Sequence, residues 1–205
     1  MIRVTGLCKT FGGGDAPAGR AGEIGRQVLA GVDLTIDGPT VLMGPSGQGK
    51  TTLLRILMGL EQPDSGRADG VGRVAAVFQE DRLCPQLTAV DNVLLVLPDG
   101  RAQRQDVQAD FAFLGMEGEA LTLPASRLSG GQKRRAALLR ALWARADTRL
   151  FDEPFTGLDP AAMEKAADLL ARRCAGAPAL LATHDRAAIQ ALGWPVLRLD
   201  ELAGR

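Results

Sequence analysis

The residues best suited to chemistry lie between Gly44 and Thr51, where the chain reads GPSGQGKT. This string fits the pattern GxxxxGK[ST] and directly follows the apolar run TVLM (40–43). Glycines let backbone N–H groups turn inward around phosphate oxygens. Lys50 would reach the β- and γ-phosphates, and the Thr51 hydroxyl would ligate Mg²⁺. The string therefore predicts a loop that binds the phosphates of a nucleotide.

Two adjacent carboxylates follow a second apolar stretch, in RLFDEP (149–154). Successive side chains of a strand point in different directions, so Asp152 and Glu153 would face different partners at the strand end. One can then hold Mg²⁺ while its neighbour faces an attacking water, as phosphoryl transfer requires. Taken alone, the pair also fits a solvated acidic turn.

A third candidate site is LSGGQ (128–132), a serine and two glycines at the start of a predicted helix. A helix N-terminus of this kind binds anions, and Ser129 can either cap the helix or donate to a phosphate. Taken alone, the string predicts an ordinary serine-capped helix.

Apolar spacing predicts the elements that position these residues. Strands are expected at 2–11, 27–36, 40–43, 73–79, 149–152 and 179–183, and helices at 50–60, 131–146 and 160–174. Segments 87–98 and 101–116 also have helical spacing and indicate a helical lobe inserted between strands. The glycine-rich segment 12–27 is interpreted as a long, mobile hairpin loop. Strands alternating with helices predict an α/β fold with a parallel sheet.

Together the three motifs resemble the ATP-binding cassette (ABC) family, and the resemblance runs from Phe11 to His184. It implies a P-loop NTPase (RecA-like) core with a mainly parallel sheet, an N-terminal antiparallel β region and an inserted helical subdomain. The whole chain would form one ABC ATPase domain. Residues 1–79 and 141–205 would make the core, and residues 80–140 would make the helical subdomain, which contains the signature motif LSGGQ (128–132).

The resemblance also implies a role for each matching residue. Nucleotide in the same chain would be held by Phe11, Gly44, Pro45, Ser46, Gly47, Gln48, Gly49, Lys50, Thr51 and Thr52. The ATP of a second cassette, paired head to tail, would be contacted by Ser129, Gly130, Gly131, Gln132 and Asp159. Mg²⁺ would be bound by Thr51, Gln79 and Asp152, and hydrolysis would involve Glu153, His184 and Gln79.

The segment FQEDRLCPQLTAVDNV (78–93) resembles bacterial importers of nitrate, sulfonates and taurine, although LCPQ stands where LLPW is usual. On this basis we expect an ATP-hydrolysing importer subunit that pairs with a second cassette and docks on an integral membrane permease. It would lie peripherally on the cytoplasmic face of the inner membrane, and an extracytoplasmic solute-binding protein is a further expected partner.

Composition limits the alternatives. Lys plus Arg equals Asp plus Glu at 24 each, so we expect no nucleic-acid partner. No apolar run approaches the ~18 residues that span a bilayer. Cys8, Cys84 and Cys174 form no CxxC pair and are expected to be small core residues. A soluble ABC-type ATPase acting on ribosomes or DNA is the alternative function, and a small-molecule kinase would leave LSGGQ unexplained.

Overall fold

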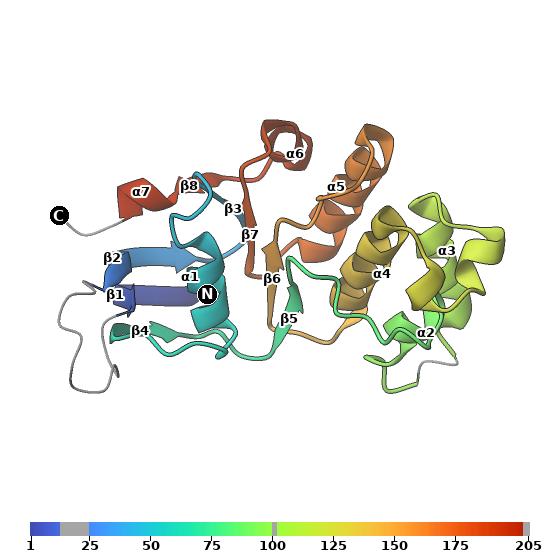
Figure 1. Cartoon of the computed structure of the whole chain (residues 1–205), viewed down its shortest axis with the longest axis horizontal. Helices are drawn as coiled ribbons and strands as arrows, with labels where there is room; N and C mark the ends of the chain where they lie inside the picture. The colour runs from blue at the N-terminus through green and yellow to red at the C-terminus, as the bar shows by residue number, and fades with distance from the viewer. Residues whose placement is uncertain (13–24, 100–101, 203–205) are drawn as a thin grey trace.

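The computed structural model describes residues 1–12, 25–99 and 102–202. Its strands form two sheets, one antiparallel with order β2-β1-β4 and one with order β5-β6-β7-β3-β8 whose described pairings are all parallel (Figure 1). The expected combination of a parallel sheet and an N-terminal antiparallel region is confirmed. Most of the segment interpreted as a hairpin loop, residues 13–24, lies outside the described residues.

The antiparallel sheet consists of β1 (Ile2–Phe11), β2 (Arg26–Ile36) and β4 (Ser65–Asp69). In β2 the buried residues toward its end alternate with exposed ones, which places its apolar face inward. β4 was not expected, because its sequence SGRAD is almost entirely exposed and has no apolar alternation. It is held at the sheet edge by antiparallel pairing with β1.

The parallel sheet places the carboxyl ends of its strands at one edge, where the phosphate loop (residues 44–51) begins. In sheet order, the strands are β5 (Val74–Val77), β6 (Thr148–Asp152), β7 (Ala179–Thr183), β3 (Pro39–Met43) and β8 (Val196–Arg198). β3 lies between two strands from the end of the chain, with Val41 opposite both Leu181 and Val196. Ligands of open α/β sheets bind at this edge.

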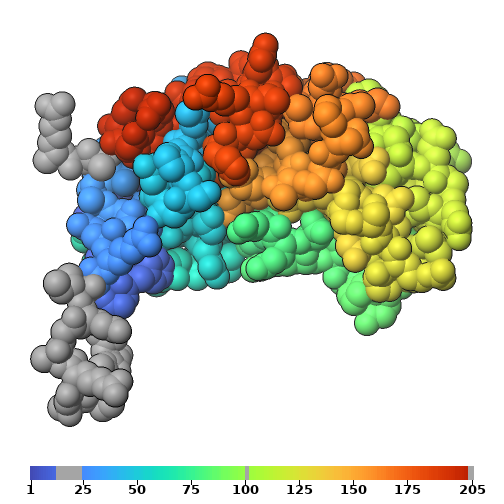
Figure 2. Space-filling model, turned by 45° about the horizontal axis from the view of Figure 1, so that its top comes forward, coloured from blue at the N-terminus to red at the C-terminus, as the bar shows by residue number. Residues whose placement is uncertain are grey.

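The helices divide into two groups, one next to the sheets and one forming the helical lobe, which Figures 1 and 2 show toward one end of the molecule. Those next to the sheets are α1 (Lys50–Leu57), α5 (Pro160–Cys174), α6 (Arg186–Leu192) and α7 (Leu199–Leu202). Those of the helical lobe are α2 (Ala89–Leu94), α3 (Arg104–Phe113), two 3₁₀ turns at Gly118–Leu121 and Ala125–Arg127, and α4 (Gly130–Trp143).

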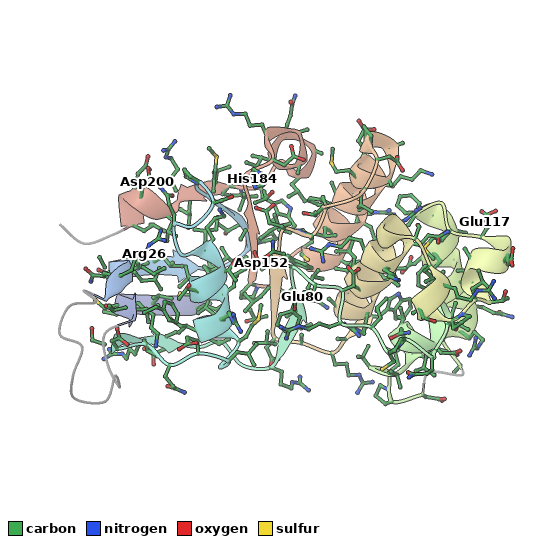
Figure 3. All side chains as sticks on the ribbon, in the orientation of Figure 1. Arg26, Glu80, Glu117, Asp152, His184 and Asp200 are labelled. Carbon is green, nitrogen blue, oxygen red and sulfur yellow. The ribbon has the colours of Figure 1, made fainter. Side chains whose placement is uncertain are left out.

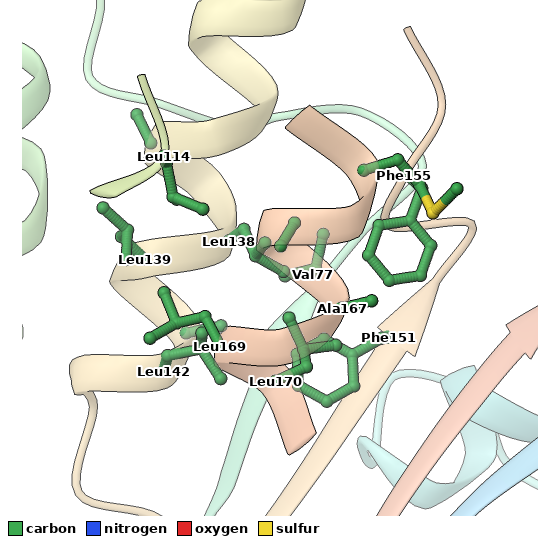
Figure 4. Close-up of a cluster of buried hydrophobic side chains, with 14 of the residues drawn as sticks. Val77, Leu114, Leu138, Leu139, Leu142, Phe151, Phe155, Ala167, Leu169 and Leu170 are labelled. Atoms are coloured by element: carbon green, nitrogen blue, oxygen red, sulfur yellow. The ribbon is translucent and has the colours of Figure 1, made fainter. Parts of the chain in front are cut away.

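The parallel sheet separates two hydrophobic cores. Phe151 and Leu181 belong to the core shared with the helical lobe and α5, part of which Figure 4 shows. Leu150 and Leu180, their neighbours along the same strands, belong to the core shared with α1 and the antiparallel sheet. Because side chains alternate across a strand, each central strand contributes to both cores. The continuous apolar runs of these strands follow from burial on both faces.

Some expected boundaries and burials were wrong. β5 ends at Val77 instead of Gln79, because the carbonyls of Phe78 and Gln79 turn away and accept hydrogen bonds from a helix side chain described below. Cys174 is buried as expected, whereas Cys84 is exposed and therefore not a core residue. Among the described residues, no helix is both long enough and apolar enough to cross a membrane.

Candidate functional site

The phosphate loop connects β3 to α1 and depends on a left-handed glycine. Gly49 is the N-cap of α1 with φ +99°, a conformation that L side chains rarely adopt. A Cβ atom there would also lie 2.8 Å from the Val28 carbonyl oxygen and 2.9 Å from Leu29. Glycine is therefore required by both backbone conformation and space. This turn aims the first N–H groups of α1 at the space beside the loop.

Lys50 is only 6% exposed although it carries a positive charge. Its Nζ donates to the carbonyl oxygens of Gly44 and, at 3.1 Å, Pro45. These bonds hold the lysine head group against the start of its own loop. An ammonium group kept beside a helix N-terminus creates a strongly positive site, which favours an anion.

The predicted residues of the loop and of the sheet edge surround one cavity of about 420 Å³, a size typical of small-molecule sites. Its lining residues are Phe11, Arg26, Val28, Ser46, Gly47, Gly49, Lys50, Thr51, Thr52, Gln79, Asp152 and Glu153. Three predicted loop residues, Gly44, Pro45 and Gln48, are not among them. Arg26 and Val28 were missed by the sequence analysis, because β2 gave no sign that its first residues reach the site.

Asp152 ends β6 and is 5% exposed. Burial raises the pKa of Asp152, and the charges of Lys50 and Arg134 act in the opposite direction. The Thr51 hydroxyl beside the carboxyl favours its charged form and so also acts to lower its pKa. Asp152, Thr51 and Gln79 all line the cavity, and each carries a side-chain oxygen, the ligand type that Mg²⁺ prefers. This donor set fits a magnesium ion shared with nucleotide phosphates.

Glu153 faces different partners from Asp152, as the alternation argument predicted. Its backbone has φ +47°, an unusual conformation for a residue with a side chain. Its carboxylate accepts a hydrogen bond from Thr183 Oγ1 at 2.8 Å and lies 2.7 Å from His184 Nδ1. The His184 side chain is 64% exposed and is not among the cavity residues. The last residue of β7 and the residue that follows it therefore orient the carboxylate that comes directly after β6.

Phe11, the last residue of β1, pairs with Arg26, the first residue of β2, and both line the cavity. Phe11 is 44% exposed, and Lys9 Nζ lies 5.2 Å from the centroid of its ring. Arg26 donates to the Gly47 carbonyl at 3.1 Å, which links the hairpin to the phosphate loop. An exposed ring beside a cavity provides a flat surface on which a base can stack.

The signature residues 128–132 form a helix cap that lies apart from this cavity. Gln132 N donates to Ser129 Oγ at 3.3 Å, and Ser129 N donates to Gln132 Oε1 at 2.9 Å, which makes a complete capping box on α4. Ser129 accepts in this cap, so its own O–H is left to donate outward. Asp159 likewise caps α5, accepting from Ala162 N at 2.9 Å. Residues 129–132 and Asp159 are absent from the described lining of the cavity.

Arg134 is a functional candidate that the sequence analysis missed. It lies on the buried face of α4 at 2% exposure. Its guanidinium donates to the carbonyls of Phe78 and Pro154, which belong to two separate segments that each contribute a neighbouring residue to the cavity lining. One signal was available in the sequence: Arg134 falls at helical spacing with Leu138 and Ala141, which are apolar and buried. A charged side chain on such a face is rarely fully buried without partners, so its position pointed to a set of specific contacts.

The fold and the site together define a P-loop NTPase. A family model described as "ABC transporter" matches residues 30–156, more than half of the chain. The chain therefore belongs to the ABC transporter family, and the expectation of an ATP-binding cassette is confirmed.

Relatives with assigned names support the same conclusion. The aliphatic sulfonates import ATP-binding protein SsuB 1 of Nocardia farcinica is 43% identical over 191 residues, which cover 90% of this chain and 71% of that protein. The cytochrome c biogenesis ATP-binding export protein CcmA of Gluconobacter oxydans is 41% identical over 163 residues, which cover 78% of this chain and 75% of that protein.

Solved structures show the same fold. A dimeric post-hydrolysis state of the ATP-binding cassette MJ0796, bound to ADP and Pi, superposes with a TM-score of 0.79. It is 27% identical in sequence, and the match covers 97% of this chain and 94% of that one. That structure is described as dimeric. In a dimer, a helix N-terminus that lies apart from the cavity of its own chain can face the cavity of the other chain.

Proposed function

We propose that this chain is the ATP-hydrolysing subunit of a bacterial ABC importer for a small solute. The observation that carries the proposal is the single cavity that joins the phosphate loop to Asp152 and Glu153. Hydrolysis needs a phosphate cradle and a carboxylate base within reach of each other, and this cavity contains both.

In the proposed mechanism, backbone N–H groups of the phosphate loop and Lys50 bind the ATP phosphates. Mg²⁺ would neutralise developing charge on the phosphates, held by Thr51, Asp152 and Gln79. Glu153 accepts the proton of the attacking water, and His184 and Thr183 keep its carboxylate oriented. The exposed His184 ring is then free to approach the γ-phosphate.

A second copy of the chain would complete each site. The capped N-terminus of α4 offers Ser129 and the adjacent glycines to an anion, and these residues are absent from the described lining of the cavity of their own chain. In a head-to-tail dimer they would meet the γ-phosphate held by the partner's loop, with Asp159 at the interface. Both sites of such a symmetric dimer close together.

The importer assignment follows the relatives named for aliphatic sulfonate import, so we propose a small anionic solute of that type. The cassette would dock on an integral membrane permease at the cytoplasmic face of the inner membrane, with an extracytoplasmic solute-binding protein delivering the solute. Purification from native membranes tests this: a stoichiometric polytopic subunit supports it, and recovery with ribosomes or DNA instead contradicts it.

The catalytic assignment is tested by Glu153→Gln, which should lower kcat by roughly 10²-fold or more because the general base is lost. ATP binding should persist, since the amide keeps the shape of the carboxylate. Glu117→Gln makes the same chemical change on an exposed residue of the helical lobe, far from Asp152 in Figure 3, and should leave kcat unchanged. Equal turnover by the two variants would contradict the role of Glu153.

A further inference from the structure

The guanidinium of Arg134 connects two segments that are distant in sequence and adjacent to the cavity. Nη1 donates to the carbonyls of Phe78 at 2.6 Å and Gln79 at 3.3 Å. Nη2 donates to the carbonyls of Asp152 at 2.9 Å and Glu153 at 2.5 Å. Nε donates to Pro154 at 3.0 Å. The first segment contains the glutamine of the cavity, and the second contains both of its carboxylates.

This arrangement uses every N–H donor of the side chain. Arginine has five donors in a rigid planar fork, and five carbonyl oxygens converge on them. The Asp81 carboxylate adds a charge partner 3.4 Å from Nη1. Lysine could not replace it, because all three of its N–H donors are on one nitrogen atom and cannot reach both segments at once.

Keeping this charge buried is costly, which argues that the contacts are strong. Burial lowers the pKa of Arg134, and the carboxylates of Asp81, Asp152 and Glu153 oppose that shift. A buried ion survives only where hydrogen bonds replace its lost hydration, and here they all come from the two site segments. Those segments are therefore tied to one rigid point on α4.

We propose that Arg134 is a positioning residue for hydrolysis, which sets the spacing between Gln79 and the Asp152–Glu153 pair. The inference rests on the proposed function of those three residues. Because Ser129 caps the helix that carries Arg134, the Arg134 side chain also transmits movement of the signature end of α4 to both segments together. ATP binding itself depends on the phosphate loop, which Arg134 does not touch in the described contacts.

The test compares Arg134→Lys and Arg134→Gln with Arg140→Gln, a matched control on the same helix. Arg140 donates to the Asp81 and Arg82 carbonyls but not to the Asp152–Pro154 segment. Three experiments are made: steady-state kinetics for kcat and KM of MgATP, binding of ADP without Mg²⁺, and amide hydrogen exchange of peptides covering 78–82 and 152–155. Thermal unfolding of each variant reports general damage.

For both Arg134 variants we expect kcat to fall by about 10- to 100-fold, since a displacement of about 1 Å can cost roughly 10²-fold. Metal-free ADP affinity should stay within about 2-fold of the parent, because the loop contacts are intact. Exchange should rise in both peptides together. Arg140→Gln should raise exchange in the first peptide only and keep kcat within about 2-fold.

Parental kcat in Arg134→Lys, or increased exchange in only one peptide, would overturn the inference while leaving ATPase activity established. If the parent itself does not hydrolyse ATP, the proposed function fails, and the exchange results still decide whether Arg134 joins the two segments. If neither Arg134 variant folds, native-state exchange of the parent in mild denaturant replaces them. The two segments should then open with one common free energy, and separate values would contradict the proposal.

Discussion

At the scale of single residues, Glu153, the proposed catalytic base, lies on a strained backbone. Its φ of +47° lies in the left-handed region, which disfavours residues with a Cβ by roughly 1–2 kcal/mol. The conformation follows the end of β6 and is supported by the bond from Glu153 N to the Ala182 carbonyl at 2.9 Å. Strain of this kind is common where a side chain must be aimed at a ligand.

The strain predicts an unusual order of stability for two variants that both lose the carboxylate. Glu153→Gly should be more stable than Glu153→Ala by about 1 kcal/mol, because glycine adopts the left-handed conformation without steric cost. At an ordinary position the alanine variant would be the more stable one. Urea denaturation of both proteins measures the difference, and a more stable alanine variant would show that the backbone is relaxed.

The cysteines allow a second prediction at this scale. Burial raises the pKa of the Cys174 thiol to about 11, so at pH 8 it stays protonated and unreactive. Cys84 is exposed and should react with iodoacetamide. Unfolding removes the burial, so guanidinium chloride should make Cys174 reactive at the same pH. Peptide mass spectrometry reads both sites, and equal labelling of Cys84 and Cys174 in the folded protein would contradict the placement.

At the scale of elements, the start of α4 packs against the loop that precedes α5. A Cβ on Gly131 would lie 2.9 Å from the Gly157 carbonyl oxygen, whereas one on Gly130 would meet nothing within 4 Å. The two signature glycines therefore differ in their local packing, although both lie in the first turn of the same helix. The contact places the signature beside the turn that ends at Asp159.

This difference predicts opposite effects on the free energy of unfolding. Gly131→Ala should destabilise the chain by about 1–3 kcal/mol through overpacking. Gly130→Ala should raise stability by about 0.5 kcal/mol, because alanine loses less backbone entropy in a helix. Chemical denaturation without nucleotide isolates these effects from any contact between copies. Equal free energies of unfolding for the two variants would mean that the loop at Gly157 moves aside at little cost.

The elements also show what sequence reasoning can reach. Sequence patterns predicted four elements close to their observed bounds: the strands β3, β6 and β7 and the helix α5. The strands have apolar runs because both of their faces are buried, and the helix has regular apolar spacing because one of its faces is buried. The strand β4 was not predicted, because it forms only through pairing with β1. The end of β5 was not predicted either, because a hydrogen bond from Arg134 to the Phe78 carbonyl sets where the strand stops. The phosphate loop, Asp152 and Glu153 were found by motif, whereas Arg26 and Val28 reach the cavity only through tertiary packing.

At the scale of the whole molecule, the separation of the signature from the cavity makes dimer formation the central expectation. Glu153→Gln should dimerise in the presence of MgATP, because ATP bound at both sites is not hydrolysed and bridges the two copies. Light scattering with size exclusion should show a monomer without nucleotide and a dimer with it. A monomer under both conditions would contradict the head-to-tail arrangement.

The role of Ser129 in that dimer can be separated from its role in the cap. Aspartate is also a good N-cap, so Ser129→Asp in the Glu153→Gln background should keep α4 intact while placing a negative charge against the partner's phosphates. We expect it to bind ATP as a monomer. Ser129→Asn has the same size and caps the helix without charge, and it should still dimerise. If both variants form dimers with ATP, Ser129 does not lie at the interface.

The position of β3 has a consequence for how the chain is made. Its sheet partners among the described residues are β7 and β8, so a growing chain that has reached residue 178 contains β3 but neither neighbour. At roughly 5–20 residues per second, an apolar strand stays unpaired for on the order of 10 s. During translation the strand before the phosphate loop is thus a natural target for chaperones, and a ribosome-stalled fragment ending there should not bind nucleotide.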